Sequence, residues 1–373
     1  MWRRCPGRLS ALAVALVAFG PADVNIAICQ VLEPAPVEGP HLLSGDSTPE
    51  PDAGVAGQRS WQVQRITMAE RPARIWVKGP IVALKSVRIE SESGARYAIV
   101  DCETGLCASV LQIPHRFETL PVGALPNSHM AFGTGRIARA WLAEPTQRME
   151  NSAIGPWVAG TLIVQDPTTR QFQLDLGLNE AFEDLRPRIA EVDGQSTLFV
   201  VRSSLDWGAA LIAVRLEGEG LLRIAGETPP VGQPGGWLNP VGLGDFMGTG
   251  HPSIAIVTSP DQGGQLQILD FADGTFTKRF TVPGVSNHVR GRQVQDMAAI
   301  ADFTGGKIAE IAIPDASRKR VRILSFAHGQ VAEPADIGLP SPVVTEIAAI
   351  QGPTGQRPRL LMGLEDGELV LLH

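Results

Sequence analysis

One pattern limits the fold of this chain more than any other: a short strand-like segment, apolar on alternate positions, returns every 48 to 55 residues. A second apolar strand, led by a turn, precedes each copy, and a third β-prone run follows several of them. The pattern predicts repeated units of about four antiparallel strands. Taking one apolar residue of each copy as equivalent, the six copies are at Val110, Leu162, Leu211, Leu266, Val321 and Leu369.

A unit of four strands has two faces and cannot bury both by itself, so several units must pack around an axis. The sequence therefore predicts an all-β chain folded as a β-propeller of about six four-stranded blades. The last unit ends at His373 directly after its third strand. We expect residues 60–80 to supply the missing outer strand and join the chain ends. The alternative count is seven blades, with these N-terminal strands forming one of their own.

The N-terminus reads as an export signal. Residues 1–22 combine three arginines with a short apolar stretch, and we place cleavage after Ala22. Residues 23–58 are rich in proline, glycine and acidic residues, which is typical of a flexible leader. Residues 59–373 form the propeller domain, in which no apolar run approaches the roughly 18 uncharged residues of a membrane helix. The sequence therefore predicts a periplasmic or secreted protein with no membrane span in its mature chain.

Composition narrows the class of partner. The net charge of −7 argues against nucleic acid, because phosphate binding depends on clustered lysine and arginine. The 40 glycines and 29 prolines favour many short strands over helices. No segment has the G-x-S-x-G pattern of a hydrolase nucleophile.

Two of the four cysteines are placed to form a disulfide. Cys102 and Cys107 flank ETGL between two apolar runs, so a hairpin would bring them together in an oxidising compartment. Cys5 leaves with the signal peptide, and Cys29 lies in the leader without an assigned role. A structural zinc site would need four ligands, and no second pair of cysteine or histidine follows at a suitable spacing.

The turns before the second strands carry a family resemblance. DFMGTGHPSIAIV from residue 245 and DFTGGKIAEIAIP from residue 302 keep the frame of a loop of the form D-x-D-G-D-G-x-x-D followed by an Ile-Ala strand. The chain thus resembles the FG-GAP/VCBS repeats of integrin-like propellers, whose loops bind calcium. The resemblance places possible calcium ligands at Asp302, Thr304 and Glu310. Because most of the acidic ligands are replaced, the alternative is a tight turn held by its own hydrogen bonds.

Polar and aromatic residues in the connections between units are candidate ligand contacts. In a propeller such connections gather around the axis, where an aromatic ring, amides and guanidinium groups would suit a sugar or a carboxylate. The alternative is that they only join neighbouring blades. The candidates are Asp184, Arg186, Trp237, Asn239, Asn287, His288 and Arg290.

These observations favour a binding or interaction module over an enzyme. Its partner would be a polysaccharide or a protein of the envelope or cell surface. The second interpretation is a purely structural subunit. The third is a hydrolase or lyase that uses carboxylates near the axis, for which Asp184, Asp296 and Glu346 are the candidates.

Overall fold

Strands make up almost all regular structure of the chain. The computed structural model describes residues 60–103, 105–112, 119–232, 235–354 and 356–373. The predicted signal peptide, leader, Cys5 and Cys29 lie outside these residues. Within them there are 25 strands and two single-turn 3-10 helices, η1 (Leu84–Ser86) and η2 (Ala327–Gly329). None of the described helices has the length and apolar content that crossing a bilayer requires.

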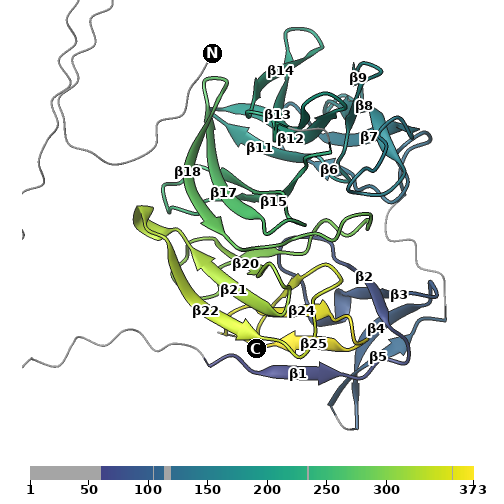
Figure 1. Cartoon of the computed structure of the whole chain (residues 1–373), viewed down its shortest axis with the longest axis vertical. Coiled ribbons are helices and arrows are strands. Elements are labelled where there is room, and N and C mark those ends of the chain that lie inside the picture. Colours follow the sequence, from purple (N-terminus) through teal and green to yellow (C-terminus); the bar gives the residue numbers. More distant parts are fainter. Residues whose placement is uncertain (1–59, 104, 113–118, 233–234, 355) are drawn as a thin grey trace, which may run out of the picture. The chain divides into compact units, whose positions relative to one another are not determined.

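Three of the sheets are four-stranded meanders, in which each strand pairs antiparallel with the next strand in the sequence (Figure 1). The first contains β2 (Pro72–Trp76), β3 (Arg88–Ser91), β4 (Arg96–Cys102) and β5 (Gly105–Val110). The second contains β15 (Leu238–Gly244), β16 (Ser253–Thr258), β17 (Gln265–Ala272) and β18 (Thr275–Pro283). The third contains β19 (Ala299–Ala301), β20 (Glu310–Pro314), β21 (Arg320–Ser325) and β22 (Ala332–Gly338).

A fourth sheet joins the two ends of the chain. It holds β23 (Ala348–Ile350), β24 (Arg359–Gly363), β25 (Leu369–Leu372) and, outside β25, the N-terminal strand β1 (Val63–Ile66). Figure 1 shows β1 in purple beside β25 in yellow. The predicted pairing of the N-terminal segment with the last unit is therefore present, although only residues 62–66 take part and β2 belongs to the first sheet.

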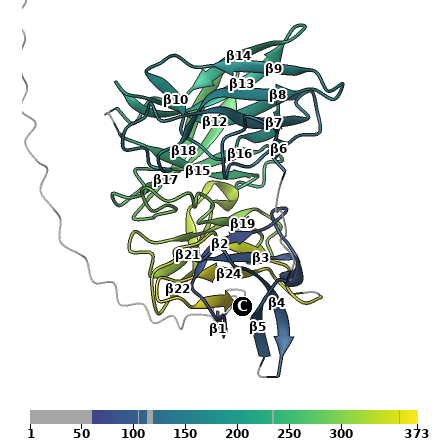
Figure 2. The same ribbon diagram turned by 90° about the vertical axis from the view of Figure 1, so that its right-hand side faces the viewer.

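Two further units merge into a nine-stranded sheet, seen side by side in teal in Figure 2. The short strand β10 pairs with β8 on one side and with β12 on the other, so it connects the units. The sequence pattern predicts only a connection between units at these residues. The strands are β6 (Ala131–Phe132), β7 (Arg139–Thr146), β8 (Val158–Gln165), β9 (Gln171–Asp175), β10 (Glu180–Phe182), β11 (Arg188–Val192), β12 (Gln195–Ser204), β13 (Gly208–Glu217) and β14 (Leu221–Glu227).

Burial follows the order of strands within each unit. Middle strands such as β20 and β25 are buried at every position, which means that both of their faces are covered. The outer strands β9, β18 and β22 alternate or are mostly exposed. All six equivalent positions of the repeat lie in strands, so the repeat pattern predicted the strands correctly.

The predicted disulfide between Cys102 and Cys107 is present and closes the hairpin of β4 and β5. The two Cα atoms are 6.0 Å apart. Next to Cys107, the Ala108 N–H donates to the Thr67 carbonyl, so the same hairpin also contacts the segment that follows β1.

Proline at position 64 tests the pairing of β1 with β25. Gln62 and His373 exchange both backbone hydrogen bonds, so Gln64 and Leu371 form the next bonded pair of the ladder. Gln64→Pro removes one N–H and leaves a buried carbonyl unpaired. We expect urea unfolding to show a loss of about 1–3 kcal/mol. The control is Arg65→Pro, whose N–H points away from β25, and an equal loss in both variants would contradict the pairing.

Removing the disulfide should weaken the hairpin without changing the fold. In the chain-entropy account, closing so short a loop stabilises the folded state by about 2 kcal/mol. We expect the double variant Cys102→Ser with Cys107→Ser to lose about that much free energy of unfolding in a denaturant titration. An unchanged unfolding midpoint would show that the bond contributes nothing.

Candidate functional site

The loop of residues 285–295, between β18 and β19, connects segments that are far apart in the sequence. The Gly291 N–H donates to the Ala153 carbonyl at 2.6 Å. The Gln293 side chain accepts a bond from Asn127 at 2.7 Å, and that of Gln295 accepts one from the Leu185 N–H at 2.7 Å. Units are numbered here in chain order: β2–β5 is the first, β6–β9 the second, β11–β14 the third, β15–β18 the fourth and β19–β22 the fifth. The loop therefore fastens the fourth and fifth units to the second and third.

Four of the predicted ligand residues are buried here, two of them in the loop itself (Asn287 and His288) and two packed against it (Trp237 and Asn239). The Trp237 indole N–H donates to the Glu183 carbonyl, and its ring lies 4.6 Å from that of His288. The Asn239 amide donates to the carbonyls of Asn287 and Gln295, at 3.1 and 2.8 Å. Each of the four is at most 1% exposed. Their N–H groups join chain segments, which favours the structural interpretation of these residues, whereas Asn239 Oδ1, Asn287 Oδ1 and His288 Nδ1 are buried without a hydrogen-bond partner among the described residues.

The remaining predicted residues differ in exposure. Asp184 is fully buried and accepts bonds from the N–H groups of Leu185 and Val201, besides an ion pair with Arg188 at 2.6 Å. Arg186 pairs with Asp296 at 2.7 Å and is 37% exposed, and Arg290 is 36% exposed. The structure thus gathers the seven residues around loop 285–295. A ligand role stays a prediction, and only these two arginines can reach solvent.

His288 is held in its neutral form by the network. Burial lowers its pKa to about 4, from an ordinary 6.5, and Arg290 acts in the same direction. The ring Nε2 lies 2.9 Å from the Arg292 carbonyl, to which it must donate, so Nδ1 carries no proton. Neutral His288 therefore keeps its hydrogen bond to the Arg292 carbonyl, within the same loop, over the physiological pH range.

The pKa of His288 predicts how stability depends on pH. Because the folded-state pKa lies below the unfolded one, the contribution is complete above pH 6.5 and is lost as the pH falls towards 4. Between about pH 7 and pH 4.5, wild type should lose about 2–3 kcal/mol more free energy of unfolding than His288→Gln, because the variant lacks this titrating group. Urea unfolding at both pH values measures this. If wild type and variant lose equal stability, His288 is not buried as a neutral ring.

The three carboxylates proposed for an enzyme are each paired with an arginine. Besides the two pairs already described, Glu346 accepts from Arg74 at 2.5 Å and from the Ile75 N–H at 2.6 Å. Burial raises the pKa of Asp296, but Arg186, His129, Arg188 and Arg74 lower it further, and the net pKa is lowered. A general acid for glycoside cleavage needs a raised pKa, so Asp296 is unsuited to that role.

The predicted calcium ligands lie in one tight turn and bond to the turn itself. Asp302 accepts from the N–H groups of Gly305 and Lys307, at 2.6 and 2.9 Å. Glu310 accepts from the Thr304 hydroxyl at 2.6 Å and from two backbone N–H groups, and burial raises its pKa. In the described part of the chain no three acidic, histidine or cysteine side chains gather as metal ligands would. Calcium binding stays a prediction, since a cation would have to compete with these bonds.

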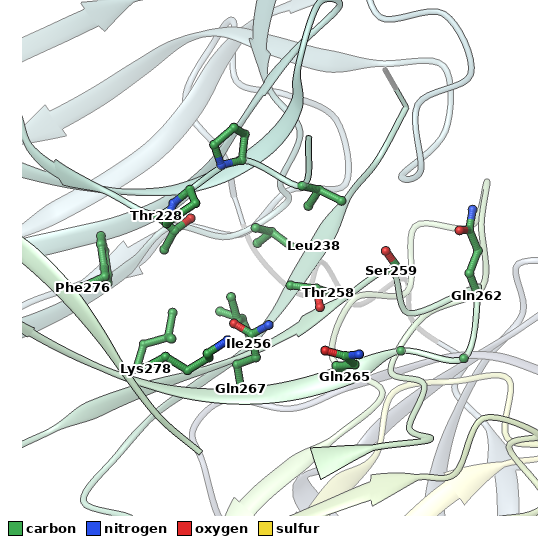
Figure 3. A pocket seen from close by; sticks show the side chains of 16 residues that line it. Thr228, Leu238, Ile256, Thr258, Ser259, Gln262, Gln265, Gln267, Phe276 and Lys278 are labelled. Carbon is green, nitrogen blue, oxygen red and sulfur yellow. The ribbon is translucent and has the colours of Figure 1, made fainter. Parts of the chain in front are cut away.

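A groove that sequence reasoning did not find lies between the third and fourth units (Figure 3). Its volume of about 650 Å³ is within the range of ligand sites. The segment after β14 forms one wall, the face of the sheet β15–β18 forms the floor, and the turn between β16 and β17 forms the opposite rim. The lining residues are Thr228, Pro229, Pro230, Val231, Leu238, Ile256, Thr258, Ser259, Gln262, Gly263, Gly264, Gln265, Gln267, Leu269, Phe276 and Lys278.

Strand alternation places the polar groups of the groove on one face. Gln265, Gln267 and Leu269 are two residues apart on β17, so they point the same way. Gln267 lies opposite Ile256 on β16, and Leu269 lies opposite Lys278 on β18. The floor therefore presents amides, apolar side chains and one ammonium group side by side.

Two glycines bring the third and fourth units into backbone contact beside the groove. A Cβ at Gly226 of β14 would lie 2.3 Å from the Gly274 carbonyl, which is closer than any real Cβ comes. A few residues further on, Pro229 and Pro230 carry no N–H and cannot extend the ladder of β14. The units therefore touch at the glycines, and the prolines line the groove beside this contact.

The groove is distinguished by polar side chains that the protein leaves unused. Those of Gln262, Gln265, Gln267 and Lys278 form no hydrogen bond or ion pair to any other described residue. In the fifth unit the corresponding residues of β21 are Arg320 and Arg322, and each pairs with a carboxylate of β22. Gln265 and Gln267 stand where the fifth unit has paired arginines, and they have no acidic partners in the described part of the chain. This difference was the one feature of the sequence that pointed to the groove.

Comparisons with known proteins leave the family open. No protein-family model and no curated protein matches the sequence. Among solved structures, the WD40 domain of Toxoplasma gondii coronin is 10% identical with a TM-score of 0.43, over 85% of this chain and 87% of that one. BBS1N, in its complex with ARL6DN, is 14% identical with a TM-score of 0.41, over 81% of this chain and 78% of that one. Neither likeness is close enough to indicate a function.

Proposed function

We propose that this chain is an exported β-propeller, similar to FG-GAP/VCBS repeat proteins, that binds a partner of the envelope or cell surface through the groove. Six units of four strands support the fold, if the nine-stranded sheet is counted as two blades connected by β10. The pairing of β1 with β25 supports closure of the ring. The disulfide supports an oxidising compartment, as the signal-like N-terminus does.

The unused amides of the groove carry the functional part of the proposal. A side-chain amide offers two donor hydrogens and an acceptor oxygen, so a pair of neighbouring amides can bind adjacent hydroxyl groups. Gln262 and Gln265 are exposed and Gln267 is half-buried, so their amides face the groove rather than the core. Leu238 and Ile256 are only 1% and 2% exposed, so the apolar surface for a ring face comes from the half-buried Phe276 and the exposed Pro229 and Pro230.

The charge of the groove favours a neutral polysaccharide over other partners. Among the described residues, Lys278 is the only ionisable one that lines it, whereas the whole chain carries −7. A polyanion would be repelled by the protein as a whole and would find one cation in the groove. An uncharged chain rich in hydroxyl groups can bond to these donors and acceptors. It is not repelled by the negative charge of the protein and does not depend on a single cation.

Calorimetric titration with neutral hexasaccharides of glucose and of N-acetylglucosamine tests this function on residues 23–373. We expect one of them to bind, and Gln265→Leu with Gln267→Leu to weaken binding at least tenfold, since each lost amide leaves a ligand hydroxyl unpaired. Gln171→Leu, at an exposed position of β9, is the matched control and should bind as wild type does.

Other outcomes of the same titration would reject the neutral polysaccharide. Binding of a hexagalacturonate alone would assign the groove to an acidic glycan through Lys278. Binding of an extended peptide alone would assign it to a protein partner. Binding that survives the double substitution would place the ligand elsewhere on the molecule.

A further inference from the structure

The two ends of the groove differ in chemistry. The turn between β16 and β17 supplies amides at one end, from Gln262 and Gln265. Phe276 and Lys278 line the other end, and Figure 3 shows them on the side away from Gln262. These two residues are two positions apart on β18, so their side chains lie on the same face of the sheet. The groove therefore ends in an ammonium group beside an aromatic ring.

Lys278 offers hydrogen-bond donors and no acceptor. Its ammonium group has three N–H donors, whereas a side-chain amide both donates and accepts. The side chain is exposed and forms no hydrogen bond or ion pair with any other described residue, since the nearby Asp270 pairs with Arg279. Lys278 is therefore suited to a ligand oxygen that can only accept, such as a carbonyl oxygen.

Phe276 offers an apolar surface whose position is fixed by the core. Its ring centroid lies 4.7 Å from that of Phe271 and 6.0 Å from that of Phe199, and both of these rings are buried. Phe276 itself is half-buried, so part of the ring faces the groove. An apolar group of a ligand is removed from water on this ring, which favours binding. A hydroxyl group in the same place would lose water without gaining a partner.

A carbonyl oxygen and a methyl group side by side make up an acetyl group. The oxygen can accept a hydrogen bond from Lys278 while the methyl contacts the Phe276 ring. A carboxylate would also pair with Lys278, but it has no methyl for the ring and adds negative charge to a protein of net charge −7. A sugar hydroxyl can use Lys278 and leaves the ring without an apolar partner.

Gln267 lies between this end of the groove and the other amides. Leu269 is opposite Lys278 in the register of β17 with β18, so Gln267 is the diagonal neighbour of Lys278, at about 7–8 Å. A sugar residue on the floor can therefore bond to Gln267 through a hydroxyl group while its substituent reaches β18.

We infer that the groove selects a glycan whose sugar residues carry acetyl groups, and that Phe276 and Lys278 determine this specificity. The acetyl carbonyl accepts from the Lys278 ammonium, and the acetyl methyl packs on the Phe276 ring. N-acetyl and O-acetyl groups share this chemistry. The inference rests on the proposed function, because it concerns the glycan of the same groove.

Calorimetric titration with three hexasaccharides tests the inference: unsubstituted glucose, O-acetylated glucose and N-acetylglucosamine. We expect an acetylated hexasaccharide to bind wild type at least tenfold more tightly than unsubstituted glucose, as one added charge-assisted hydrogen bond implies. The acetylated sugar that binds more tightly identifies the linking atom as nitrogen or oxygen. Lys278→Met keeps an apolar stem and removes the donors, so it should lose most of this preference.

Lys319→Met is the matched control. It removes the same charge from an exposed lysine in the turn between β20 and β21, away from the groove lining, and should keep the preference. Phe276→Ser should lose the preference as Lys278→Met does, and if it fails to fold, Lys278→Met decides alone. Equal affinity of wild type for all three hexasaccharides, or an unchanged preference in Lys278→Met, would overturn the inference.

The two proposals fail in different ways. If unsubstituted glucose binds as tightly as the acetylated sugars and Gln265→Leu with Gln267→Leu weakens all of them, the groove remains a glycan site and the acetyl specificity is rejected. If wild type binds none of the three hexasaccharides, both proposals are rejected.

Discussion

The structure depends on one constraint: its middle strands are apolar on both faces and need cover on both. β20 and β25 are buried at every position, which a lone four-stranded sheet in water cannot provide. Successive sheets must therefore pack against one another, and this holds for the last sheet too. β1 supplies its outer strand from the opposite end of the chain, so the free edge of β25 is covered only once both ends are present.

Buried polar groups at the centre follow from the same packing. Connections between sheets carry backbone and side-chain groups that cannot be left without partners, and loop 285–295 provides many of those partners. Residues such as Asn239 and His288 are thereby committed to the interior. A few polar atoms there still lack a partner among the described residues, including Asn239 Oδ1 and His288 Nδ1. Unpaired polar side chains that reach solvent lie at the boundary of the third and fourth units, beside the backbone contact of Gly226 with Gly274. Arg290 of loop 285–295 lies between these regions, since it bonds to Asp261 and to the Gly235 carbonyl.

Local patterns in the sequence predicted the strands, the disulfide and the origin of β1, because alternation and turn residues act over a few neighbours. They could not predict β10, whose three residues are too short for a periodic signal and pair only because two sheets hold it. The burial of Trp237 and His288 could not be predicted either, because a polar or aromatic residue in a connection gives the same sequence pattern whether it faces solvent or another segment. The groove could not be predicted because its lining comes from two units that are brought together only by folding. The one indication in the sequence was glutamine at position 265, where the fifth unit has the paired Arg320.

A crystal structure of residues 23–373 grown with the neutral hexasaccharides tests the central claim most directly, namely that the protein binds through the boundary between two sheets and not at loop 285–295. The account predicts sugar density in the groove, with hydroxyl groups within hydrogen-bond distance of Gln265 and Gln267. Density over loop 285–295, against Arg186 and Asp296, would contradict it and return the binding site to the axial connections.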